Sequence, residues 1–268
     1  MASSAAFFDL DRTLISGASA FPFGIEAWRQ GLADWGDIAR WTSGALAFLI
    51  TGDKGKGASL HLRGEFLDRI RGSAVADLDR IGQAVLPRLV DRVRPESRKL
   101  IAMHHEAGRD TWIVSASPQR IVEPLAAALG MTGAIGTEGE VVDGRFTGEL
   151  AGPFIYGSGK AQAIDKLAGD RGYDLKVSYA YSDSISDLPM MELVGHPVAV
   201  NPDSQLDTVA HERGWPIVIF ARKTKRAFAL SGAMTASIGA ATIAYAIGRR
   251  HGRTTTLAQL GRTTLDSG

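Results

Sequence analysis

Short apolar runs along this chain alternate with stretches that repeat apolar residues at helical spacing. Residues 5–10 are apolar, brief and ended by polar residues, a pattern that predicts a buried strand. The same pattern predicts further strands at 110–117, 177–184, 197–201 and 216–220. Helical spacing predicts intervening helices at 96–108, 117–130, 158–169 and 185–195. Strands that alternate with helices indicate a parallel sheet covered by helices on both faces.

Two segments depart from this alternation. Residues 18–93 carry only helical patterns and predict a helical insert after the first strand. Residues 138–150 predict a hairpin with Asp143-Gly144 as its turn. In the helix expected at 117–130, Ser117 is the expected N-cap and Pro118 the first helical residue.

We therefore expect an α/β protein with a doubly wound, Rossmann-like parallel sheet. Residues 1–17 and 94–222 are expected to form the core, and residues 18–93 an inserted helical cap. Residues 223–268 are expected to form a C-terminal hydrophobic helix with a basic tail.

The C-terminal segment has an unusual composition. Residues 227–248 contain no charged side chain, and this length is about that needed to cross a bilayer core. Basic residues flank the segment on both sides, which suits lipid headgroups. Its many alanines and glycines make membrane insertion marginal. The segment either spans a membrane, lies on one, or packs on the protein or on a second subunit.

Composition excludes several other classes of protein. The 268 residues carry a formal net charge of +1, so no overall field favours nucleic acid. The absence of cysteine excludes disulfides and thiolate metal sites and fits a reducing compartment. No basic residue precedes the first apolar run, so a secretory signal is not indicated. We expect a cytoplasmic protein, with membrane contact only through residues 227–248.

Polar residues occur where the predicted strands end. Parallel sheets place ligand sites at the carboxyl ends of their strands. Carboxylates, one hydroxyl and one amine are expected to meet there, contributed by Asp9, Asp11, Ser115, Lys160, Asp183 and Asp187. Alone, the stretch DLDRT is as typical of a turn or a helix cap as of a catalytic site, and a lysine at a helix start is usually solvated. The shared order of these residues along the predicted elements is what favours a site.

This set of groups suits phosphoryl chemistry. Clustered carboxylates repel one another and need a cation, and hard oxygen ligands favour Mg²⁺. Lys160 and Ser115 would hold phosphoryl oxygens. A carboxylate facing phosphorus can act as a nucleophile, and a second carboxylate two residues later can protonate the leaving oxygen and then deprotonate water.

These stretches also carry a family resemblance. FFDLDRTL, IVSAS, GKA and SDSISD resemble, in order, the four motifs of the haloacid dehalogenase superfamily, over residues 5–220. The helical insert, SASP and PVAVNPD are similar to subfamily IB, the subgroup that includes phosphoserine phosphatases. The resemblance implies that Asp9 is the nucleophile and that Asp11 is the general acid/base and gives its backbone carbonyl to Mg²⁺. Thr13 would steady the Asp11 loop.

The resemblance implies roles for the remaining motif residues as well. Asp183 would ligate Mg²⁺ with Asp9 and Asp11, and Asp187 would belong to that ligand set or lie just outside it. The residues that would bind the substrate, chiefly its phosphoryl group, are Thr13, Ser115, Ala116, Lys160 and Ser186. The expected activity is a Mg²⁺-dependent phosphomonoesterase that acts on a small organic phosphate ester.

The chain also departs from the phosphoserine phosphatase pattern. Ala18 stands where those enzymes carry a glutamate for the substrate ammonium, although Glu26 could serve from another geometry. Ser182, Ser186 and the second and third residues of Ser115-Ala116-Ser117 differ as well. We therefore expect a substrate other than phosphoserine. Two alternatives remain open: a membrane-associated regulatory or scaffold protein with little turnover, and a phosphotransferase.

Overall fold

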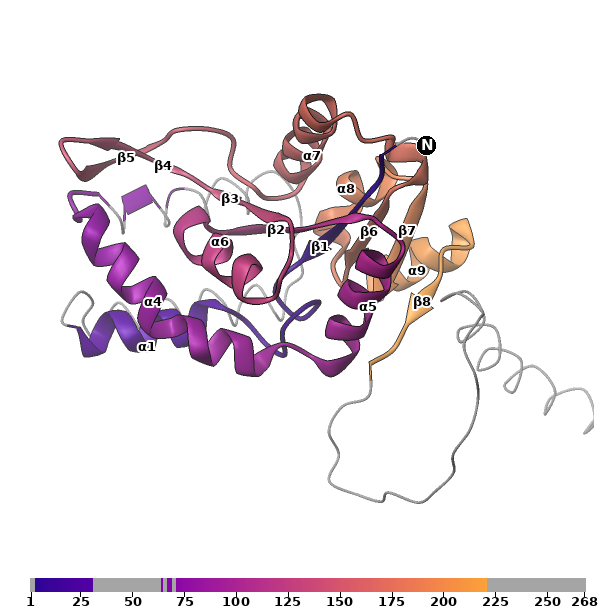
Figure 1. Ribbon diagram of the computed structural model, residues 1–268, viewed down its shortest axis with the longest axis horizontal. Coiled ribbons are helices and arrows are strands. Elements are labelled where there is room, and N and C mark those ends of the chain that lie inside the picture. Colours follow the sequence, from indigo (N-terminus) through magenta and orange to yellow (C-terminus); the bar gives the residue numbers. More distant parts are fainter. Residues whose placement is uncertain (1–2, 31–63, 65–66, 69–70, 221–268) are drawn as a thin grey trace, which may run out of the picture.

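A six-stranded sheet forms the centre of the computed structural model, which describes residues 3–30, 64, 67–68 and 71–220. All neighbouring strands are parallel, and their order is β3-β2-β1-β6-β7-β8. The strands span β1 Ala5–Asp9, β2 Asp110–Pro118, β3 Gly133–Thr137, β6 Tyr179–Ser182, β7 His196–Val200 and β8 Ile217–Val218. The N-terminal strand therefore lies inside the sheet, between β2 and β6 (Figure 1). The expected parallel α/β fold is confirmed.

Helices cover both faces of this sheet. Successive side chains of a strand point to opposite faces, so Phe7 and Phe8 enter different cores. The Phe8 face packs on α4 Val75–Arg92, α5 Pro95–Glu106 and α6 Gln119–Ala128. The Phe7 face packs on α7 Ser158–Arg171, α8 Leu188–Glu192 and α9 Ser204–Arg213. Short 3₁₀ turns, η1 Leu175–Val177 and η2 Ile185–Asp187, flank β6.

The predicted hairpin is confirmed and is joined to the start of α4. It comprises β4 Gly139–Val142 and β5 Arg145–Leu150. Asp143 and Gly144 both have positive φ, 48° and 74°, as a two-residue hairpin turn requires. Backbone hydrogen bonds join Gly72 N–H to the Phe146 carbonyl at 2.8 Å and Phe146 N–H to the Ser73 carbonyl at 3.0 Å. The hairpin therefore braces the chain as it enters α4 (Figure 1).

The described part of residues 18–93 contains two helices, α1 and α4. Helix α1 Ala20–Arg29 packs against α4. Leu78, Ile81 and Val85 of α4 join the core that also contains Ile121 of α6, so α4 is part of the main hydrophobic core as well as of the insert. Much of residues 18–93 and the whole of 223–268, including 227–248, lie outside the described residues. Among the residues described, no helix combines the length and apolarity that a membrane span needs.

Two local predictions were wrong. Helix α6 begins at Gln119 with Pro118 as its N-cap, and Ser117 belongs to β2. The Ser117 side chain does not cap the helix because its hydroxyl lies 3.0 Å from the Ser19 hydroxyl. The helix expected at 185–195 is instead η2 followed by α8, which ends at Glu192.

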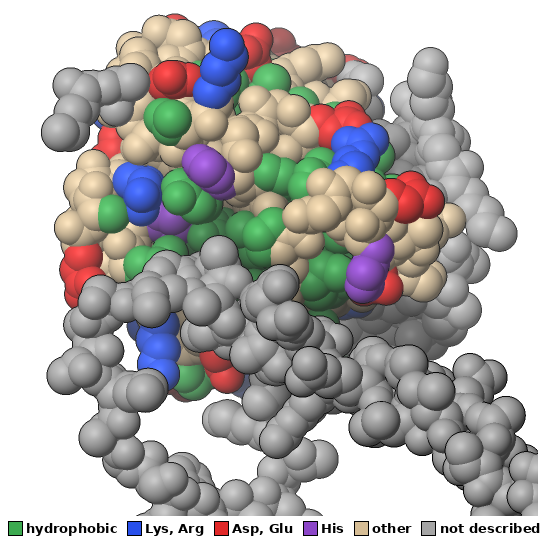
Figure 2. Space-filling view, turned by 90° about the vertical axis from the view of Figure 1, so that its right-hand side faces the viewer, with side chains coloured by type: hydrophobic (Ala, Val, Ile, Leu, Met, Phe, Trp, Pro, Cys, Tyr) green, Lys and Arg blue, Asp and Glu red, His purple; other side chains and the backbone are tan. Residues whose placement is uncertain are grey.

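Charge on the surface is mixed. Figure 2 views the molecule from the right-hand side of Figure 1, and basic and acidic side chains are interspersed there among apolar ones. The described part of this face has no continuous patch of one sign, in agreement with the formal net charge of +1.

A buried histidine supports the sheet beneath the predicted site. His104 of α5 is fully buried, and its Nε2 lies 2.8 Å from the Tyr181 hydroxyl. Burial, with the charges of Arg109 and His105, lowers the pKa of His104 to about 4. In the unfolded chain the His104 imidazole takes up a proton at its ordinary pKa of 6.5, whereas in the folded protein it does so only near pH 4.

We expect His104 to lower the stability of the protein by about 3 kcal/mol as the pH falls from about 6.5 to about 4. The measurement is the unfolding free energy against pH for the wild type and for His104→Phe. In this window, the slope of the unfolding free energy against pH should be smaller for the variant than for the wild type by about 1.4 kcal/mol per pH unit. His211→Phe, at a well-exposed position, is the control. Equal slopes in the wild type and the His104 variant would refute the prediction.

Candidate active site

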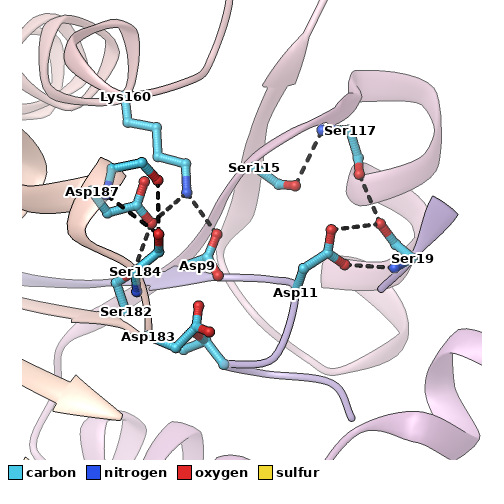
Figure 3. A network of polar contacts seen from close by, with 12 residues as sticks. Asp9, Asp11, Ser19, Ser115, Ser117, Lys160, Ser182, Asp183, Ser184 and Asp187 are labelled. Carbon is cyan, nitrogen blue, oxygen red and sulfur yellow. Dashed lines mark hydrogen bonds and ion pairs between the residues drawn. The ribbon is translucent and has the colours of Figure 1, made fainter. Parts of the chain in front are cut away.

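Three segments far apart in the sequence bring charged side chains to the carboxyl end of β1. Asp9 is the last residue of β1 and pairs in register with Val114, which precedes Ser115. Lys160 reaches the same point, and its Nζ lies 2.6 Å from Asp9 Oδ1 and 2.7 Å from Asp187 Oδ2 (Figure 3). All three charged side chains are buried, with Lys160 only 3% exposed. One ammonium thus bridges two carboxylates away from water.

Lys160 is held in place by the way α7 begins. The helix starts at Ser158, after Gly157, which has a positive φ of 54°. A Cβ on Gly159 would collide with the Phe154 carbonyl, so only glycine fits where the chain turns into the helix. This close approach fixes Lys160 in the first turn, where its side chain points at Asp9 (Figure 3).

Asp187 is held from two sides. Its Oδ2 accepts hydrogen bonds from Lys160 and, at 2.7 Å, from the hydroxyl of Ser182, the last residue of β6. Its Oδ1 is buried and has no hydrogen-bond partner among the described residues. Asp187 therefore fixes Lys160 and keeps one free acceptor inside the site.

Asp183 lies on the other side of Asp9. Arg12 Nε is 2.9 Å from Asp183 Oδ2, an ion pair without hydrogen-bond alignment, and the Thr13 hydroxyl is 3.5 Å from Oδ1. Arg12 has a positive φ of 63°, which marks the sharp turn after β1. Ser97 of α5 donates to the Thr13 carbonyl at 3.1 Å and braces this turn from below.

Asp11 is turned toward the start of α1. Its Oδ1 accepts the Ser19 backbone N–H at 2.6 Å, and its Oδ2 accepts the Ser19 hydroxyl at 3.1 Å. Figure 3 shows the Asp9 and Asp11 carboxylates pointing into different parts of the site. The two acids that follow β1 thus have separate surroundings.

The pKa values at the site follow from this crowding. Burial raises the pKa of Asp9 to about 7, opposed by Lys160 and assisted by the charge of Asp187. Burial and the charge of Asp9 raise the pKa of Asp183 to about 8, opposed by Arg12. Burial alone would lower the pKa of Lys160, but Asp187 and Asp9 outweigh it and raise that pKa. Burial also raises the pKa of Asp11, against the two hydrogen bonds from Ser19.

Comparison with known proteins agrees with this geometry. Residues 6–192 match the family of haloacid dehalogenase-like hydrolases. This chain belongs to that family. It is 38% identical to "Phosphoserine phosphatase SerB1" of Mycobacterium tuberculosis, over 92% of this chain and 82% of that protein. It is 32% identical to "Histidinol-phosphatase" of Neisseria meningitidis, over 80% of this chain and 98% of that protein.

A solved structure matches the fold of this haloacid dehalogenase-like hydrolase. It is a protein of unknown function from Bordetella pertussis Tohama I, with a TM-score of 0.70 and 25% identity. The match covers 81% of this chain and 99% of that chain.

The site of this hydrolase fits a small divalent cation in part. Asp183 Oδ2 and Asp187 Oδ1 are buried oxygens without hydrogen-bond partners among the described residues, and burial with mutual repulsion raises the pKa values of Asp9 and Asp183. A hard cation would relieve both conditions. No group of three or more histidine or acidic side chains is arranged around one point within the described residues.

The other predicted substrate-binding residues lie at the rim of the hydrolase site. Ala116 stands in β2 between Ser115 and Ser117. Ser186 lies in η2, and its hydroxyl is directed at that of Ser184, 3.1 Å away, rather than at Lys160. Glu26 forms an ion pair with Arg88 at 3.5 Å and accepts a hydrogen bond from Gln30 at 3.2 Å. These partners make Glu26 a poor substitute for the missing glutamate at Ala18.

Sequence reasoning missed several residues that contact the predicted ones. Arg12 pairs with Asp183, Ser182 holds Asp187, and Ser19 holds Asp11. For two of these residues, position next to the motifs was a usable signal: Arg12 lies between two motif residues, and Ser182 directly precedes Asp183. Ser19 had no such signal, since nothing in a sequence pattern relates it to a carboxylate eight residues earlier.

Proposed function

We propose that this hydrolase is a Mg²⁺-dependent phosphomonoesterase that forms an aspartyl-phosphate on Asp9. The observation that carries the proposal is the buried Lys160 ammonium bound to both Asp9 and Asp187. It holds the Asp9 carboxylate in one orientation at the end of a rigid strand, which is what in-line attack on phosphorus needs. Its positive charge also lies where charge builds up on the phosphoryl oxygens.

The reaction divides between the two acids that follow β1. An Asp9 oxygen would bond to phosphorus while the ester P–O bond breaks, and Asp11 would give its proton to the leaving alcohol. Asp11 would then take a proton from water as the water oxygen attacks phosphorus. The P–O bond to Asp9 breaks, so that inorganic phosphate leaves and Asp9 is regenerated. The raised pKa of Asp11 suits a group that must begin the reaction protonated.

Mg²⁺ would be held by the carboxylates of Asp9 and Asp183 and the backbone carbonyl of Asp11. The bound cation supplies positive charge that offsets the carboxylates and the incoming phosphate. Asp187 lies just outside this set because Lys160 and Ser182 occupy its Oδ2. Arg12 then keeps Asp183 in place from the solvent side.

The phosphoryl group would be bound by Lys160, Ser115 and the backbone beside Ala116. Thr13 and Ser186 would support the two loops that frame it. The helical segment 18–93 would serve as a cap that excludes water and sets specificity.

The substrate class that we propose is a small phosphate ester of a primary alcohol. Phosphoserine and histidinol phosphate, which give two relatives their names, are both of this kind. Ala18 and the paired Glu26 leave out the ammonium contact of the phosphoserine enzymes, which supports a substrate other than phosphoserine itself. Candidates for testing therefore include histidinol phosphate, glycerol 3-phosphate and O-phosphoserine.

The test is release of inorganic phosphate from this panel and from p-nitrophenyl phosphate, with Mg²⁺ and after its removal by a chelator. We expect turnover with Mg²⁺, loss on chelation and recovery when Mg²⁺ is restored. Transfer to an added alcohol instead of water would reveal a phosphotransferase. No turnover of any ester would overturn the proposal.

We expect Asp11→Asn to lower kcat by at least ~10²-fold on alkyl phosphates, because an amide can neither give nor take the required protons. On p-nitrophenyl phosphate the leaving group departs without an acid, so a phosphorylated protein should accumulate. Intact-mass measurement after mixing would detect one added phosphoryl group. An Asp11→Asn protein with wild-type turnover of alkyl phosphates would contradict the assignment.

A further inference from the structure

Ser19 occupies a helix-capping position but does not cap the helix. It directly precedes α1 as the N-cap residue, where a serine side chain commonly bonds the free N–H groups of the first turn. Here the side chain makes no such bond. Ser19 is 5% exposed, and both its backbone N–H and its hydroxyl are directed at Asp11. The Ser19 side chain therefore contacts the Asp11 carboxylate instead of capping α1.

Hydrogen bonds around Ser19 connect the end of β2 to Asp11. When Asp11 is ionised, its carboxylate only accepts, so the Ser19 hydroxyl donates to Asp11 Oδ2. The Ser19 oxygen is then the acceptor for the Ser117 hydroxyl, 3.0 Å away. The backbone N–H of Ser117 donates to the Ser115 hydroxyl at 3.2 Å. These bonds therefore run from the end of β2 to Asp11 (Figure 3).

We propose that Ser19 is a positioning residue that orients the Asp11 carboxylate for proton transfer, and that Ser117 holds the Ser19 hydroxyl in the required direction. The inference rests on the proposed function, since it assumes that Asp11 serves as general acid and base. Within the described residues, both hydrogen bonds to the Asp11 side chain come from Ser19. The start of α1 and the end of β2 thus determine together where the reacting proton lies.

A hydroxyl suits this task better than a permanent donor. It can accept as well as donate a hydrogen bond, so Ser19 keeps contact with Asp11 whether that carboxyl carries its proton or has given it up. Alanine at position 19 would keep the bond from the backbone N–H and remove only the hydroxyl bond. The expected effect is therefore partial and confined to proton transfer.

The leaving group of the substrate separates positioning from structural damage. An alkyl alcohol departs from phosphorus only with a proton, whereas p-nitrophenolate departs without one. The value of kcat/KM includes the step in which the leaving group departs. Misplacement of Asp11 should therefore slow alkyl phosphates much more than p-nitrophenyl phosphate.

The experiment compares kcat/KM of both substrates in Ser19→Ala, Ser19→Thr and Ser117→Ala with Mg²⁺ present, using the panel's best alkyl phosphate. For Ser19→Ala we expect a loss of ~10-fold or more on the alkyl phosphate and less than ~3-fold on p-nitrophenyl phosphate. Ser19→Thr should restore most of the loss, and Ser117→Ala should show the same pattern, more weakly. Ser16→Ala is the matched control, because Ser16 is exposed three residues earlier and its hydroxyl contacts the Arg92 carbonyl, away from Asp11.

Melting temperatures show whether each variant folds. Ser19→Ala loses no helix cap, and the loss of its buried hydroxyl bonds should lower the melting temperature by only a few degrees. Equal slowing of both substrates, or no slowing, would overturn the role of Ser19 while leaving the phosphatase assignment intact. Failure of the wild type to hydrolyse any ester would overturn both. If Ser19→Ala fails to fold, Ser117→Ala decides by the same comparison.

Discussion

Asp9→Asn is expected to abolish turnover of every phosphate ester while leaving the fold intact. An amide cannot form the aspartyl-phosphate, and loss of a nucleophile commonly costs at least ~10⁴-fold in kcat. Steady-state phosphate release measures the loss. Asp170→Asn is the control, since Asp170 is exposed on α7 and pairs with Lys166 on the surface.

Asp9→Asn should also change how the stability of the protein depends on pH. Burial raises the pKa of Asp9 to about 7, so between pH 4 and 7 the unfolded chain has lost a proton that the folded protein still holds. The contribution of Asp9 to stability is therefore present at low pH and is lost as the pH rises through 7. The amide of the Asp9→Asn variant does not titrate, so the melting temperature of the variant relative to the wild type should rise across this window. An active variant, or a relative melting temperature that falls with pH, would contradict the assignment.

Lys160→Met is expected to remove activity and stability together. The variant leaves Asp9 and Asp187 buried beside each other without the ammonium that bonds both. Breaking a buried ion pair by removing one partner typically costs about 3–5 kcal/mol. We expect a loss of this size in the unfolding free energy at pH 8, and a smaller loss at pH 5, where Asp9 takes up a proton.

Lys166→Met provides the matched comparison on the same helix. The Lys166 side chain is 79% exposed and pairs with Asp170 one turn later, so its removal should change stability by less than about 0.5 kcal/mol. Chemical unfolding of the two variants at pH 8 and pH 5 measures both differences. If the Lys160 variant proved as stable as the Lys166 variant at pH 8, the buried ion pairs would not support the site as we describe.

The sequence predicted five of the six strands, because each is an apolar run with polar ends, and it missed the edge strand β3 Gly133–Thr137. The sequence predicted the short elements less well, where a 3₁₀ turn and an α-helix fit the same pattern. The segment after Asp183 has helical spacing throughout, yet the chain forms η2 first, because Ser184 accepts the backbone N–H of Ser186. Ser117 likewise precedes a proline in a good capping pattern, but its partner is Ser19, almost one hundred residues away.

The candidate site was predictable to the extent that the sheet was. Asp9 ends β1, Asp183 directly follows β6 and Asp187 lies in the short turn η2 beyond it, so their meeting follows from parallel topology. The contacts of Asp11 and Arg12 depend on a loop in which Arg12 and Gly17 both have positive φ. Such a loop has no periodicity that a pattern could reveal, so the turn of Asp11 toward Ser19 required the structure.

The central position of β1 affects how the protein is made. Ala6 pairs with Thr111 on one side and with Tyr179 on the other, so β1 cannot complete its pairing until the chain has been synthesised past Tyr179. Until then the face of β1 that carries Phe7 lacks the native cover of α8 and α9. Pairings so distant in sequence also close slowly. Newly made chains should therefore depend on chaperones. The pairing of β6 with β1, which brings Asp183 beside Asp9, should be the last step of folding.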